Sequence, residues 1–218
     1  MPITKSGEDN APAWCGFSYF EVVTLAKGET RDFVRRGKRG KIIVGTGTCE
    51  IRVGDEVVAG KFKTNVDLQN DSDHFAVRTL NDPATLVWMC GDWETETSSG
   101  IFQVGKSDER EDKGDAVDYA KETSFDCHYH DCDEYWLIFK GKAKILSEGK
   151  EYYVKTGDIV FTRAGDEHDV LEIYEDLEAF YFEDATPEGG RVGHLHKTEA
   201  KAKRHDVSTK PLPADFPV

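Results

Sequence analysis

Four side chains able to bind a metal ion occur at regular spacings in the second half of the chain. His128 and His130 are two residues apart, Glu134 follows four residues later, and His168 comes after further strand-like sequence. Alternate side chains of a β-strand share a face, so His128 and His130 would point the same way and a short loop would return Glu134 to them. Three imidazoles and one carboxylate suit one divalent transition metal, such as Fe, Mn, Ni, Zn or Cu.

This spacing resembles the first sequence motif of the cupin superfamily. In that motif a glycine and five further residues precede the H-x-H pair, three or four residues separate the pair from a glutamate, and six residues separate the glutamate from a second glycine. His128, His130, Glu134 and Gly141 fall at these positions, while Glu122 stands where the leading glycine is usual.

The second cupin motif is also matched in part. Gly157, Gly165 and His168 stand at its positions, but Arg163 replaces the usual proline and Glu172 the usual asparagine. The resemblance implies that His168 completes the ligand set.

Together the two motifs cover about residues 118–186, and they imply a small antiparallel β-barrel with a metal in its mouth. A relic barrel without metal is the alternative. Because three of the seven histidines in the chain stand at ligand positions, with the glutamate also in place, the metal site is favoured.

Short strand-like runs separated by turn residues predict an all-β protein. The runs are residues 41–44, 49–53, 74–78 and 84–89 in the first half, and 135–139, 143–146, 151–154, 159–162 and 179–182 in the second.

An internal repeat predicts two tandem cupin-type antiparallel β-barrels, each a double-stranded β-helix or jelly roll. Asp32, Val34 and Lys38 stand opposite the first three ligands, within a register error of two residues, so the first barrel would lack metal. The alternative is a single barrel that the first 92 residues extend. The expected parts are an N-terminal barrel over 1–92, a linker over 93–122, a metal-binding barrel over 123–186 and an extended tail over 187–218.

Strand alternation also predicts the residues around the metal. Trp136 and Ile138 share a face with Glu134 and would form the substrate pocket, while Glu172 shares a face with His168. We expect Glu172 to transfer a proton, or alternatively to orient a histidine ligand. Arg163 would pair with a substrate carboxylate, unless it is a surface arginine at a hairpin.

Two polar segments have less specific interpretations. The charged run over 106–115 is typical of a solvated loop, with a lid as the alternative. His194 and His196 form a second H-x-H pair without a carboxylate at cupin spacing. A surface tail or a contact with a neighbouring subunit is therefore favoured over a second metal site.

Composition limits the partners of this chain of 218 residues. A net charge of −14 argues against nucleic acid and anionic membranes as partners. No apolar run approaches the roughly 20 residues of a membrane-spanning helix, and no secretory signal is visible. Five scattered cysteines do not form a disulfide framework. We expect a cytoplasmic protein that forms a homodimer, because sheet edges need cover and two-fold pairs are common.

Three functions are compatible with such a site. The first is an enzyme that acts on a small oxygenated metabolite, a sugar derivative or a hydroxy or oxo acid, by isomerase- or lyase-type proton transfer. The second is a non-haem Fe(II) dioxygenase, and the third is a barrel that binds a small ligand without catalysis. Turnover without O2 would separate the first from the second.

Overall fold

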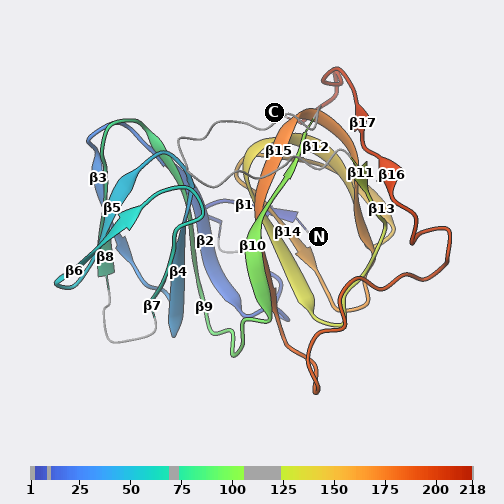
Figure 1. Ribbon diagram of the computed structural model, residues 1–218, viewed down its shortest axis with the longest axis horizontal. Coiled ribbons are helices and arrows are strands. Elements are labelled where there is room, and N and C mark those ends of the chain that lie inside the picture. The colour runs from blue at the N-terminus through green and yellow to red at the C-terminus, as the bar shows by residue number, and fades with distance from the viewer. Residues whose placement is uncertain (1–2, 9–10, 69–73, 106–123, 218) are drawn as a thin grey trace. The chain divides into compact units, whose positions relative to one another are not determined.

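The polypeptide consists of β-strands joined by turns and loops, without a helix in the part that the structure describes (Figure 1). The computed structural model describes residues 3–8, 11–68, 74–105 and 124–217. Accordingly, these residues include no helix of the length and apolarity needed to cross a membrane. The all-β class predicted from the sequence is confirmed.

The described residues divide into two compact units. We call them the N-terminal unit, which comprises residues 6–8, 11–68 and 74–93, and the C-terminal unit, which comprises residues 3–5, 94–105 and 124–217.

Two four-stranded sheets form the N-terminal unit. In the first sheet the order is β2 (Phe17–Leu25), β9 (Ala84–Gly91), β4 (Arg39–Thr46) and β7 (Asn65–Leu68). In the second sheet the order is β3 (Thr30–Val34), β8 (His74–Thr79), β5 (Cys49–Val53) and β6 (Glu56–Gly60). Apolar side chains from both sheets, including Leu25, Ile42, Ile51 and Val77, form one buried core, as expected for a jelly roll.

A larger sheet forms most of the C-terminal unit. Its main path runs through β1 (Ile3–Lys5), β14 (Asp158–Thr162), β12 (Asp133–Ser147), β15 (His168–Asp184) and β10 (Ser98–Val104). Three further pairings complete the unit: β13 (Lys150–Lys155) joins β12, β17 (Ser208–Thr209) joins β15, and β11 (Ser124–Phe125) pairs with β16 (His205–Asp206).

The long strands β12 and β15 are bent rather than straight, and this bending curves the sheet (Figure 1). Their pairing contains register shifts between Ile138 and Ala143. Gly141 lies within this stretch with φ of 93°, and a Cβ there would lie 2.1 Å from the backbone oxygen of Asp176. Only glycine fits such a close approach of two strands.

The expected linker and the expected start of the N-terminal barrel need correction. Residues 98–104 were expected to belong to the linker because the region is polar. They form β10 instead, and every residue of β10 pairs with β15. Residues 3–5 pair with β14 instead of joining the N-terminal unit. Both pairings satisfy sheet edges that would otherwise expose unpaired backbone groups. The tail is largely extended and pairs with its own unit through β16 and β17. Residues 106–123, including the charged run, lie outside the described residues.

Candidate metal centre

The four predicted ligands converge at one end of the C-terminal unit. His128 and His130 come just before β12, Glu134 is the second residue of β12, and His168 is the first residue of β15. Two backbone hydrogen bonds join His128 and His168, with N···O distances of 3.2 and 2.8 Å. All four side chains are buried, and their donor atoms lie within 4.8 Å of one another.

Three of the four donor atoms lie at the spacing expected around a single metal ion. Glu134 Oε2 lies 2.8 Å from His168 Nε2 and 3.3 Å from His130 Nε2. These distances match neighbouring ligands of one ion, which are about 3 Å apart when each bond is about 2.1 Å. Glu134 Oε2 and His168 Nε2 are buried, and neither forms a hydrogen bond of good geometry within the described residues. Such buried polar atoms are costly unless an ion or another partner satisfies them.

Backbone carbonyls orient the three imidazoles. Each ring places Nδ1 beside a carbonyl oxygen and so leaves Nε2 as the metal donor. The pairs are His128 with Asp126 at 2.8 Å, His130 with Gly193 at 3.2 Å, and His168 with Asp166 at 3.3 Å. A guanidinium nitrogen of Arg191 also lies 3.2 Å from His130 Nδ1. Because guanidinium only donates, the Nδ1–H of a metal-binding His130 goes to Gly193.

The electrostatics keep His128 and Glu134 in their metal-binding forms. Burial, together with the nearby imidazoles of His168 and His194, lowers the pKa of His128 to about 3, so this ring is neutral at physiological pH. Burial by itself would raise the pKa of Glu134, but His168 and His130 hold that pKa well below its usual range. A neutral imidazole and an ionised carboxylate are the forms that bind a metal.

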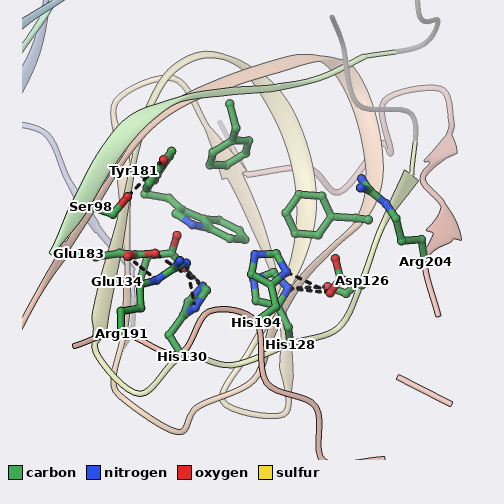
Figure 2. A pocket seen from close by; sticks show the side chains of 13 residues that line it. Ser98, Asp126, His128, His130, Glu134, Tyr181, Glu183, Arg191, His194 and Arg204 are labelled. Atoms are coloured by element: carbon green, nitrogen blue, oxygen red, sulfur yellow. Dashed lines mark hydrogen bonds and ion pairs between the residues drawn. The ribbon is translucent and has the colours of Figure 1, made fainter. Parts of the chain in front are cut away.

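The ligands open onto a cavity of about 340 Å³, a size suited to a small molecule. One wall consists of aromatic rings, in which Trp136 packs edge-on against Phe102 and Phe125 at centroid distances of 5.2 and 6.1 Å. Polar lining comes from Glu183 on β15 and from Arg191 and His194 on the tail (Figure 2). The cavity thus combines an apolar wall with a few polar groups beside the donors.

Glu183 is a buried carboxylate of the cavity that is separate from the four-donor group. It pairs across the sheet with Glu134, and its Oε1 lies 3.8 Å from His130 Nε2. Arg191 holds its other oxygen through an ion pair of 2.7 Å. Burial, followed by the charge of Glu134, raises the pKa of Glu183, although His130 and Arg191 act in the opposite direction.

The predicted pocket and catalytic residues have mixed outcomes. Trp136 lines the cavity, as expected from strand alternation. Ile138 belongs to the hydrophobic core and does not line the cavity, because the barrel interior is already filled at its depth. Arg163 lies exposed in the turn between β14 and β15, outside the cavity lining.

Glu172 also lies away from the cavity, contrary to the prediction. Ile145 pairs with Val170 and Lys144 pairs with Glu172, so β15 has one extra residue at this point. This β-bulge reverses the alternation and turns Glu172 away from the face of His168. Its carboxylate instead contacts Lys210 and accepts a 2.7 Å hydrogen bond from the Tyr174 hydroxyl.

Sequence reasoning missed four residues around the site: Glu183, Asp126, Arg191 and His194. Glu183 has the same parity as Tyr181, which also lines the cavity, but the bulge in β15 breaks the alternation counted from His168, so the sequence did not indicate Glu183. His194 was noticed as part of an H-x-H pair, but its place beside the ligands depends on where the tail docks. Local spacing carried no signal for Asp126 or Arg191.

Comparison with known proteins identifies the class. The family model for the cupin domain matches residues 116–181. An uncharacterised protein of Sinorhizobium fredii, y4oW, is 32% identical over 199 residues, which cover 89% of this chain and 90% of the relative. This chain therefore belongs to the cupin superfamily, as its two motifs predicted.

Solved structures show that the fold extends to both units. AerE from Microcystis aeruginosa matches with a TM-score of 0.50 at 13% identity, over 76% of this chain and 86% of that one. Ylba from E. coli matches with a TM-score of 0.50 at 11% sequence identity, over 84% of this chain and 90% of that one. A mutant of Bacillus subtilis oxalate decarboxylase matches with a TM-score of 0.51 at 8% sequence identity, over 84% of this chain and 76% of that one. At such identities the likeness concerns the fold, and this protein is a two-barrel cupin with one group of four side chains among its described residues that could bind a metal ion.

Proposed function

We propose that this protein is a metal-dependent enzyme that acts on a small oxygenated metabolite by isomerase- or lyase-type proton transfer. The observation that carries the proposal is the arrangement at the cavity. Three of the four convergent donor residues, His128, His130 and Glu134, line a cavity of about 340 Å³. The same cavity is lined by Glu183, a further buried carboxylate. A sugar derivative or a hydroxy or oxo acid of a few carbons suits this volume. A homodimer in the cytoplasm stays a prediction from the sequence.

The ligand residues His128, His130, Glu134 and His168 would hold one divalent transition metal. Such an ion supplies Lewis-acid polarisation of a substrate carbonyl. The aromatic wall of the cavity displaces water around the substrate, and this strengthens the electrostatic interactions of the polar groups.

Glu183 is the group placed to move a proton. Its Oε1 would accept a proton from the carbon beside the substrate carbonyl, while Arg191 holds Oε2 and fixes the direction of the carboxylate. The C–H electron pair moves toward the carbonyl oxygen. The same carboxyl then returns the proton to the former carbonyl carbon, while the proton of the neighbouring hydroxyl moves to the former carbonyl oxygen. The isomerisation therefore balances and consumes no oxidant or reductant.

The proposal is tested by hydrogen exchange. The metal-loaded protein is incubated in D2O with hydroxy acids, oxo acids and sugar derivatives, with and without O2, and NMR detects deuterium entering beside the carbonyl. We expect exchange that does not need O2. Glu183→Gln should keep the metal and lose about 10²–10⁴-fold in kcat, the usual contribution of a general base.

Glu172→Gln is the matched control, because it makes the same change outside the cavity and should leave the rate and the metal content unchanged. Turnover that requires O2 would favour the dioxygenase instead. An unchanged rate in Glu183→Gln would remove the role assigned to that carboxylate.

A further inference from the structure

The two H-x-H pairs of the chain lie side by side. Tyr129 and Leu195 exchange two backbone hydrogen bonds, each with an N···O distance of 2.9 Å. This antiparallel bridge places residues 194–196 of the tail alongside residues 128–130. Because residues on either side of a bridge pair share a face, both histidines of the tail turn toward the side that carries the ligand histidines.

Asp126 connects the tail to the ligand His128. Its carboxylate Oδ2 accepts hydrogen bonds from His196 Nε2 at 2.8 Å and from His194 Nδ1 at 3.2 Å. Its backbone oxygen accepts the Nδ1–H of His128 at 2.8 Å. The His194 ring also stacks on the His128 ring, with a centroid distance of 3.6 Å and an interplanar angle of 6° (Figure 2).

The preceding tail residues contact the ligand His130. The backbone oxygen of Gly193 accepts its Nδ1–H at 3.2 Å, and Arg191 lies beside the same ring. The carboxylate of Asp131, the residue after His130, accepts the backbone N–H of Val192, with N···O distances of 3.1 Å to Oδ2 and 3.2 Å to Oδ1. One tail segment therefore contacts two of the three ligand histidines.

We infer that residues 191–196, here named the tail clasp, position His128 and His130 and thereby slow the release of the metal. The inference rests on the metal-binding part of the proposed function. His194 and His196 are positioning residues, since they act on His128 through stacking and through Asp126. Outer partners of this kind typically change metal affinity by about 10–100-fold when they are removed.

A second metal at Asp126 and His194 is the competing interpretation, since these two residues and His128 also form a group of possible ligands. The hydrogen bonds favour the positioning role. His128 already donates from Nδ1 to the Asp126 backbone, and Asp126 Oδ2 already accepts from both tail histidines. Counting the bound metal separates the two interpretations.

The test uses the full chain loaded with Co(II), and stopped-flow measurement of its transfer to an excess of chelator. We expect His194→Gln/His196→Gln to bind one Co(II) and to release it about 10–100-fold faster, with a changed visible absorption of the bound ion. His194→Phe keeps a stacked ring without the hydrogen bond, so it should recover part of the slow release. Denaturant unfolding checks that each variant is folded.

Two controls make the comparison specific. His74→Gln makes the same substitution at an exposed histidine of the N-terminal unit, and Lys210→Gln removes a tail contact with Glu172. Both should release Co(II) at the original rate. If the double variant released Co(II) at the rate of the original chain, the inferred role of the tail clasp would be overturned. Two Co(II) per original chain, with one lost in His194→Gln, would overturn it in favour of the second metal site. An original chain that binds no Co(II) would remove the metal centre and the clasp together.

Discussion

The two units share a strand order but differ at the position of Glu134, the candidate carboxylate ligand. The order β2, β9, β4, β7 in the N-terminal unit corresponds to β10, β15, β12, β14 in the C-terminal unit. Gly40 on β4 pairs with Leu68 and Cys90, just as Glu134 on β12 pairs with Thr162 and Glu183. A glycine therefore stands where the C-terminal unit has its carboxylate ligand.

An indole ring fills the space beside Gly40. A Cβ at Gly40 would lie 2.5 Å from the ring of Trp88, which packs edge-on against Phe75 at a centroid distance of 4.6 Å. Phe33 stacks on Phe75 at 5.0 Å and completes the aromatic cluster. The same framework thus supports a filled core in one unit and an open cavity with polar donors in the other.

The position of the third histidine shows the same contrast. His74 pairs with Val34 in the N-terminal unit, as His168 bridges to His128 in the C-terminal unit. His74 and Val34 are exposed, whereas both histidines of the C-terminal pair are buried. A single histidine at the matching place therefore does not make a metal site. The difference lies in burial and in the number of convergent donors.

The largest expected effect comes from removing a donor in only one unit. His168→Ala should lower metal affinity by more than about 100-fold, because losing a ligand costs more than losing an outer partner. His74→Ala, the corresponding change in the N-terminal unit, should leave affinity unchanged. Competition with a chelator of known affinity measures both. Equal losses in the two variants would contradict the assignment of the metal to the C-terminal unit.

The next effect concerns stability instead of metal. Trp88→Ala should lower the free energy of unfolding by about 3–5 kcal/mol, because it leaves a cavity among Phe33 and Phe75. Metal stoichiometry should stay at one per chain. Denaturant unfolding and metal analysis give the two quantities, with the milder Trp88→Phe as control. Loss of metal in a folded Trp88→Ala protein would show that the filled unit takes part in the site.

The smallest expected effect tests whether the Trp88 ring is what requires glycine at position 40. Gly40→Ala should cost about 1–3 kcal/mol, since the new methyl group meets the Trp88 ring in a packed core. In a Trp88→Leu background the same substitution should cost less, because the smaller side chain leaves room. A double-mutant cycle measured by denaturant unfolding gives the coupling. Equal costs in both backgrounds would mean that the ring is not what requires glycine.

Much of the site followed from local sequence. The spacing of His128, His130 and Glu134 could be interpreted without a structure, because strand alternation and a short loop are local features. Strand character in β4, β5, β12 and β14 was predictable for the same reason. The alignment of the N-terminal unit was two residues out, with Lys38 in place of Gly40, because its loops contain no residue that marks the register.

Other features needed the folded chain. The bulge at Leu171 adds one residue to β15, so alternation counted from His168 indicated Glu172 when the cavity carboxylate is Glu183. Arg163 was considered either as the partner of a substrate carboxylate or as a surface arginine at a hairpin, and its exposed place in the turn between β14 and β15 agrees with the second alternative. Residues 98–104 were assigned to the linker because the region is polar. Composition does not reveal that these residues pair with the edge of β15.

The amino-acid sequence by itself determined the all-β character and the candidate ligands His128, His130 and Glu134, because these depend on residues close together in the chain. The cupin class and the fourth ligand, His168, followed from the resemblance to the two cupin motifs. Tertiary structure alone decided which carboxylate faces the cavity, that Trp88 fills the space beside Gly40, and that His194 stacks on His128. These contacts join segments 48 to 66 residues apart in the sequence. They are selected by the packing of the whole unit, about which local spacing and periodicity carry no information.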